Sequence, residues 1–167
     1  HLDPAGPTQL ARMAIQTAES AGSAGAKVEG MNYLAGGLMG SGWVEEAVST
    51  YHHAFKEAMR LRLYSPALIV LNNLTIGRCV EYLAADALDE LDLLGEIPAS
   101  PVKSLIASHI EGNAAYYAGD LERSARAFER EIEVSREIGQ GRGLVRGRKG
   151  LADCLRGMDR GAEARVV

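Results

Sequence analysis

The chain has 167 residues, of which 47% are hydrophobic and 24% charged, and its formal net charge at pH 7 is −4. A chain of this length buries about 70% of its unfolded surface, so it needs neither a disulfide nor a metal to stabilise a core. The negative net charge argues against a general affinity for phosphate backbones, and we expect no direct contact with nucleic acid. No apolar run approaches the roughly 20 residues that span a bilayer, so we expect no membrane partner.

The residue types favour helices throughout the chain. Ala, Leu, Glu and Arg are abundant, and no segment shows the sustained alternation of β-branched or aromatic residues that is typical of strands. The two cysteines, Cys79 and Cys154, lie inside predicted helices and lack the close second thiol of a redox or zinc motif. The sequence therefore predicts an all-α fold and a reducing, cytoplasmic location.

Apolar residues at three- and four-residue spacing predict a series of helices, each with one buried face. In chain order these cover residues 8–21, 26–39, 43–64, 67–80, 84–94, 102–118, 121–138 and 144–157, and a last helix begins near Gly161. Ser65-Pro66 is expected to end the third helix, because proline disfavours helical geometry in the residue before it, and Pro66 is itself preset for the first turn of the next helix. The longest loop is expected at residues 95–101, and residues 139–143 are expected to form a flexible connector.

A loose internal repeat emerges when the turns are aligned on the small residue that follows each of them. These small residues recur at intervals of about 40, 37 and 40 residues: Ala47, Ala87, Ser124 and Ala164. They allow the second helix of each hairpin to approach the first closely. Larger residues four positions later are expected to fill the space between successive hairpins: Tyr51, Leu91 and Phe128. Leucines occupy the matching core position of the first helices: Leu34, Leu74 and Leu151.

The best-preserved copy has Ala-Gly-Asp at residues 118–120, then Glu122 and Phe128, and the last copy reads Leu-Arg-Gly-Met-Asp-Arg-Gly-Ala-Glu-Ala at residues 155–164. These segments resemble the tetratricopeptide repeat from about Gly6 onward. The resemblance implies a right-handed α-α superhelix, a tetratricopeptide-like solenoid of about four helical hairpins. The copies exceed the family's usual length of about 34 residues, and they lack its first-helix tryptophan. Longer repeats of this kind are similar to those in sensor regions of LuxR-type ATP-binding bacterial regulators related to the maltose regulator.

The organisation expected from this pattern is a connector or cloning remnant at residues 1–7, followed by a single repeat domain over residues 8–167. The array starts on a second helix and ends a few residues into another, whereas solenoids normally carry polar caps on their terminal repeats. We expect that the chain is a fragment of a longer protein. The alternative is that its terminal helices pair with another copy.

Other candidate chemistry favours structural roles. His52, His53 and His109 are possible metal ligands, but adjacent histidines on a helix point about 100° apart and do not easily share one ion. The glycine-rich residues 139–143 follow a helix, whereas a dinucleotide-binding loop follows a strand. No catalytic set can be argued from residue order. The sequence therefore predicts a non-enzymatic protein with no metal and no cofactor.

Groove-facing positions are the candidate binding residues. In a solenoid of this type the first helix of every hairpin lines the inner groove, and its inward positions recur at three- and four-residue steps. The candidates by this register are Asn32, Asn72, His109, Asn113, Tyr116, Arg146, Lys149 and Arg156. Asparagine is a mediocre helix former, and its amide offers both a donor and an acceptor to an extended peptide. The alternative is that the asparagines hydrogen-bond neighbouring helices.

The basic candidate residues also have two interpretations, as ligand-binding groups or as members of ion pairs within the protein. Arg146, Lys149 and Arg156 could hold an anionic ligand or a peptide carboxylate. They could instead pair with Asp153, Asp159 and nearby glutamates. Within the best-preserved copy we expect Tyr116 to contribute to recognition, Tyr117 to pack beside the turn, and Phe128 to stack the hairpins.

The first functional hypothesis is a module that binds a peptide, a protein partner or a small effector in a concave groove. The resemblance implies that it belongs to a larger bacterial regulatory protein, a transcriptional regulator or signalling ATPase. The second hypothesis is a self-association module that forms a homodimer through exposed terminal helices.

Overall fold

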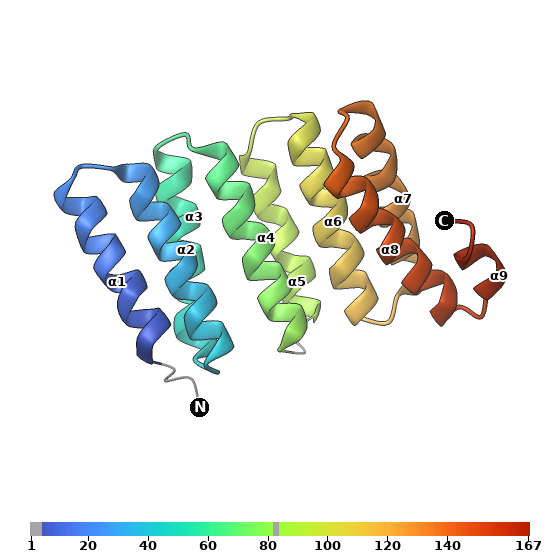
Figure 1. Ribbon diagram of the computed structural model, residues 1–167, viewed down its shortest axis with the longest axis horizontal. Coiled ribbons are helices and arrows are strands. Elements are labelled where there is room, and N and C mark those ends of the chain that lie inside the picture. The colour runs from blue at the N-terminus through green and yellow to red at the C-terminus, as the bar shows by residue number, and fades with distance from the viewer. Residues whose placement is uncertain (1–4, 82–83) are drawn as a thin grey trace. The chain divides into compact units, whose positions relative to one another are not determined.

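The computed structural model describes residues 5–81 and 84–167, and the side chains of residues 8–81 and 86–167. These residues form helices joined by short turns, and no strand occurs among them (Figure 1). The expectation of an all-α fold is confirmed. Contacts divide the chain into two compact units, one up to Gly77 and one from Arg78 onward. The single repeat domain over residues 8–167 stays a prediction.

The first unit contains three complete helices and most of a fourth. In chain order these are α1 (Ala5–Ser20), α2 (Ala24–Gly40), α3 (Val44–Arg60) and α4 (Tyr64–Val80). The chain reverses at each turn, so α2 packs against α1 and α3. Helix α1 starts at Ala5, within the connector expected at residues 1–7, and residues 1–4 lie outside the described residues.

The second unit is built around α7. Its elements are α5 (Ala84–Asp89), the 3-10 helix η1 (Glu90–Glu96), α6 (Pro101–Tyr117), α7 (Leu121–Glu137), α8 (Gly141–Gly157) and α9 (Gly161–Ala164). Helices α6 and α8 both pack extensively on α7. Phe128 of α7 is buried between them, against Gly112 of α6 and Gly150 of α8. Its predicted stacking role is confirmed within this unit.

One turn geometry recurs and accounts for the repeat length. Each of these turns has a residue with positive φ, at intervals of 20 residues within each run: Gly22, Gly42 and Arg62, then Gly119, Gly139 and Asp159. At Gly42, for example, the N–H of Trp43 donates to the carbonyl of Leu38 at 3.0 Å, which satisfies one of the last free carbonyls of α2. A helix of 17 residues and a turn of three form one unit, so a hairpin repeats about every 40 residues.

The predicted third helix, residues 43–64, is wrong at its end. Helix α3 stops at Arg60 because Arg62 adopts a φ of 57° and reverses the chain. Helix α4 begins at Tyr64, so Pro66 lies in its first turn, where the missing N–H would have no helical partner. Pro66 does not end the third helix, but its expected place in the first turn of the next helix is confirmed.

Two further boundaries differ from the prediction. The helix predicted at residues 84–94 becomes a 3-10 helix from Glu90. The carboxylate of Glu90 forms an ion pair with the guanidinium of Arg78 at 2.8 Å. The connector predicted at residues 139–143 is mostly the first turn of α8. Gln140 caps that turn by accepting from the N–H of Gly143 at 2.9 Å. A Cβ on Gly143 would lie 2.5 Å from Ser135 Oγ, so this glycine serves close helix packing.

Candidate binding site

A pocket of about 160 Å³ is lined by side chains from α6, α7 and α8, all within the second unit. Five of the eight sequence-predicted residues line it: His109, Asn113, Tyr116, Arg146 and Lys149. A closed cavity of about 150 Å³ holds one benzene molecule. The pocket therefore has room for one side chain or a short piece of extended backbone.

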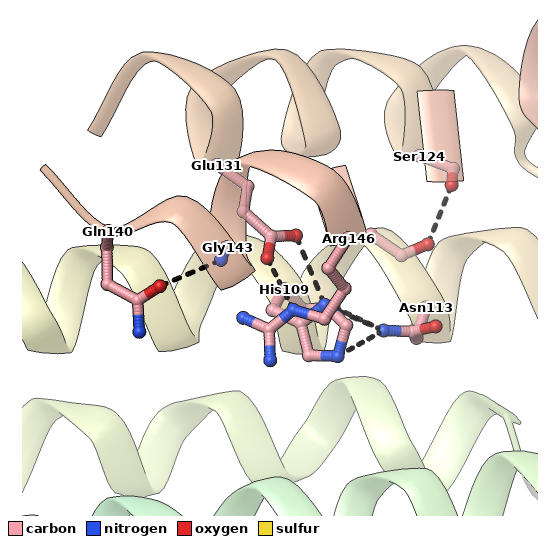
Figure 2. Close-up of polar contacts among 8 residues, drawn as sticks. His109, Asn113, Ser124, Glu131, Gln140, Gly143 and Arg146 are labelled. Atoms are coloured by element: carbon pink, nitrogen blue, oxygen red, sulfur yellow. Dashed lines mark hydrogen bonds and ion pairs between the residues drawn. The ribbon is translucent and has the colours of Figure 1, made fainter. Parts of the chain in front are cut away.

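Glu131 connects the three helices that line this pocket, and Figure 2 shows its contacts with His109 and Arg146. Its side chain extends from α7 and is 0% exposed. Its Oε2 lies 3.1 Å from Nδ1 of His109 on α6, and its Oε1 accepts from Nε of Arg146 on α8 at 2.6 Å. A buried carboxylate is tolerated only when it is paired and hydrogen-bonded, so Glu131 holds both partners in defined positions.

Sequence reasoning missed Glu131, although the sequence contains a signal for it. Ser124, Phe128 and Ser135 form the buried stripe of α7, and Glu131 occupies the position between the last two of them. A charged residue on a buried helical stripe requires a partner. The partners come from other helices, so the signal would have identified the residue but not the contacts.

Asn113 uses its amide nitrogen within its own helix. Nδ2 donates to the backbone oxygen of His109 at 2.8 Å and lies 3.1 Å from Nε2 of the His109 ring. Part of the predicted donor capacity of Asn113 is thus taken up locally. No protein donor among the described residues engages its Oδ1.

The basic residues at the pocket are largely paired, as the second of the two interpretations expected. Lys149 donates to Asp153 at 2.9 Å, and Arg156 pairs with the same carboxylate. Partial burial by itself raises the pKa of Asp153, but the hydrogen bonds from Lys149 and Arg156 outweigh it, so the pKa is lowered overall. The hydrogen bond to Asp153 raises the pKa of Lys149. Arg156 reaches Asp153 but does not line the pocket.

Two tyrosines stand at the pocket. Tyr116 is 40% exposed and Tyr117 is 52% exposed, and their rings pack edge to face with centroids 5.9 Å apart. Both line the pocket. Tyr117, which was expected to pack beside the turn, packs edge to face against Tyr116 and is half-exposed.

The predicted asparagines of the first unit, Asn32 and Asn72, lie elsewhere, and Asn32 bonds to a neighbouring helix. Nδ2 of Asn73 on α4 donates to Oδ1 of the buried Asn32 on α2 at 3.1 Å. Asn72 makes a long contact of 3.4 Å to Asn73, and its own Oδ1 is buried without a partner among the described residues. This pairing matches the structural interpretation of these side chains.

The described part of the chain holds no group of three or more His, Cys, Asp and Glu side chains arranged to bind a metal ion. None of the helices described is long and apolar enough to cross a membrane.

Comparison with known proteins adds no relative to these observations. No protein-family model matches the chain, and no curated protein matches it. The fold and the side-chain geometry are therefore the basis for any functional inference, which begins from the pocket on α6, α7 and α8.

Proposed function

We propose that the chain is a non-catalytic binding module, and that its second unit takes a short extended segment of a peptide or protein partner in the pocket on α6, α7 and α8. The observation that supports this is the convergence of polar side chains from two helices on one small pocket, His109 and Asn113 from α6 with Arg146 and Lys149 from α8. Buried or half-buried polar groups that retain unused hydrogen-bonding atoms favour a polar ligand.

The aromatic rim favours a peptide over a small effector. Tyr116 and Tyr117 present large ring surfaces beside the polar groups. Tyrosine is enriched at protein interfaces because it combines apolar area with a hydroxyl and loses little conformational entropy. A pocket of about 160 Å³ next to exposed rings suits a chain that inserts one group and lies across the rim.

The wider role follows from the sequence resemblance and not from the site. Similarity to the sensor repeats of ATP-binding bacterial regulators leads us to place this module within a larger cytoplasmic regulatory protein. In that setting, binding at the pocket would be passed to the rest of the protein through a change in helix packing.

The test is selection of binders from a random peptide library on the immobilised chain, followed by calorimetric titration of the selected peptide. Tyr116→Ala and Asn113→Ala should weaken binding about tenfold or more, the equivalent of about 1.4 kcal/mol. The matched controls are Tyr33→Ala and Asn72→Ala, the same changes in the first unit. Equal affinity for all four variants, with unchanged helical circular dichroism, would contradict the proposal.

A second candidate function is self-association through α1. Leu10 is 69% exposed and Met13 is 56% exposed on that helix, and Leu10 lines an apolar depression with Tyr33 of α2. Exposed apolar clusters of this kind often mark protein interfaces. Light scattering would measure the mass of the unaltered chain and of the Leu10→Glu variant in solution. A monomeric mass for the unaltered chain at high concentration would rule out self-association.

A further inference from the structure

The proton positions beneath the pocket follow from the contacts of Glu131. Its Oε1 accepts from Nε of Arg146 at 2.6 Å, and arginine has donors only. A carboxylate bonded to a guanidinium offers acceptors on both oxygens. The atom that faces Oε2, Nδ1 of His109 at 3.1 Å, must therefore carry a hydrogen.

This placement determines the role of the other ring nitrogen. In the neutral imidazole with hydrogen on Nδ1, Nε2 is an acceptor. Nδ2 of Asn113 donates to the backbone oxygen of His109 at 2.8 Å, whereas its similar distances to Nε2 (3.1 Å) and Nδ1 (3.3 Å) place it over the face of the ring, away from the in-plane lone pair of Nε2. The Asn113 amide therefore packs against the ring, and neither of the two distances to ring nitrogens is a hydrogen bond.

The atoms that remain give the pocket a defined pattern. Asn113 keeps Oδ1 as an acceptor, since its nitrogen is committed to His109. Arg146 keeps both terminal nitrogens as donors, because within the described residues only its Nε is engaged. Arg146 and Asn113 lie on opposite sides of the His109 ring in Figure 2, and both line the pocket.

We infer that Glu131 is the positioning residue of this site: it fixes the tautomer of His109 and orients Arg146, so that the pocket offers the donors of Arg146 together with the Oδ1 acceptor of Asn113. That pair complements a secondary amide, whose carbonyl accepts and whose N–H donates. The site is thus expected to recognise the amide groups of a peptide backbone. The assignment of a secondary amide as the ligand rests on the proposed function, whereas the assignment of the His109 tautomer does not.

Glu131→Gln should move the hydrogen of the neutral His109 ring from Nδ1 to Nε2. The carbonyl of glutamine can accept from Arg146 Nε, which leaves its amide nitrogen facing Nδ1 of His109 as a donor. Nδ1 then becomes the acceptor and the hydrogen moves to Nε2. Nε2 thereby changes from an acceptor to a donor, while Nδ2 of Asn113 keeps its bond to the backbone oxygen of His109.

Long-range proton–nitrogen spectra of the chain labelled with ¹⁵N-histidine report this directly, at a mildly alkaline pH where imidazole is neutral. The chain has four histidines, and His109→Gln identifies the signals of His109. We expect the Nδ1–H signature in the unaltered chain and the Nε2–H signature in Glu131→Gln. The matched control is Glu111→Gln, which alters another glutamate that pairs with arginines across α6 and α7 and should keep the Nδ1–H signature.

An Nε2–H signature in the unaltered chain would overturn the inference, and so would an unchanged tautomer in a folded Glu131→Gln variant. If that variant loses its helical circular dichroism, the spectrum of the unaltered chain decides by itself.

A second titration separates the inference from the proposed function. N-methylacetamide has one carbonyl and one N–H, and N,N-dimethylacetamide lacks the N–H. We expect the former to shift the His109 and Arg146 signals at lower concentration than the latter. Equal effects would overturn the amide assignment. Failure of peptide selection together with the Nδ1–H signature would overturn the proposed function and support Glu131 as a positioning residue.

Discussion

Phe128 lies in a gap that two glycines leave open, and this contact offers a sharp test of how the second unit is held together. A Cβ placed on Gly150 of α8 would lie 2.6 Å from three atoms of the Phe128 ring, and one on Gly112 of α6 would lie 2.8 Å from it. The ring is almost fully buried. Its removal and the addition of a methyl group opposite it should therefore not act independently.

The magnitudes follow from this geometry. Phe128→Ala removes a buried ring and should lower the free energy of unfolding by about 3–5 kcal/mol. Gly150→Ala should cost about 1–3 kcal/mol through overpacking, offset by up to about 1 kcal/mol of improved helix propensity. In the double variant the new methyl group enters the space the ring has left, so the combined loss should be smaller than the sum by at least about 1 kcal/mol.

The assay is urea unfolding followed by circular dichroism, with amide hydrogen exchange in α6, α7 and α8 to follow the second unit separately, because two units need not unfold in one transition. Gly25→Ala is the control, since no atom lies within 4 Å of its added Cβ. It should leave stability unchanged or raise it slightly. Additive losses for Phe128 and Gly150, within about 0.5 kcal/mol, would refute this account of the packing.

Two further predictions concern the turns and the response to acid. Arg62 has a φ of 57°, so Arg62→Gly should raise the free energy of unfolding by about 0.5–1 kcal/mol. Gly42 has a φ of 83°, so Gly42→Ala should lower the free energy of unfolding by about 1–2 kcal/mol. A thermal unfolding experiment in which Gly42→Ala is the more stable variant would contradict the turn assignment. The folded-state pKa of Asp153 is lowered from 3.8, so its contribution to stability is present above that pH and lost as the pH falls through the folded value. Asp153→Asn should reduce the acid sensitivity measured by urea unfolding at pH 2–5, and Asp159→Asn is the control; an unchanged acid profile would argue against the ion pairs.

Local patterns predicted most of the helices because helical periodicity depends only on residues that are close along the chain. Residues 121–138 carry an apolar stripe, and Asp120 before them caps the helix by accepting from the N–H of Arg123. The prediction for this helix differs from the structure by one residue at its end. The boundary near Arg62 was missed because arginine carries no turn signal, and its positive φ comes from the reversal between α3 and α4.

The candidate site was predicted in part. Register placed His109, Asn113 and Tyr116 on one face of a helix, and the structure brings them together with Arg146 and Lys149. Register could not show that Asn32 pairs with Asn73 on another helix, because the partner of an inward side chain depends on how the helices pack. The two outcomes differ only in which neighbour each side chain meets.

The sequence by itself determined the all-α class and the repeat of about 40 residues, because these depend on the identity and spacing of residues close along the chain. Tertiary structure decided which polar side chains pair with one another and which keep free hydrogen-bonding atoms. Glu131, His109 and Arg146 come from three different helices, and their contacts arise only when α6 and α8 pack on α7. A buried carboxylate must be neutralised where it lies, so packing sets the chemistry of the pocket.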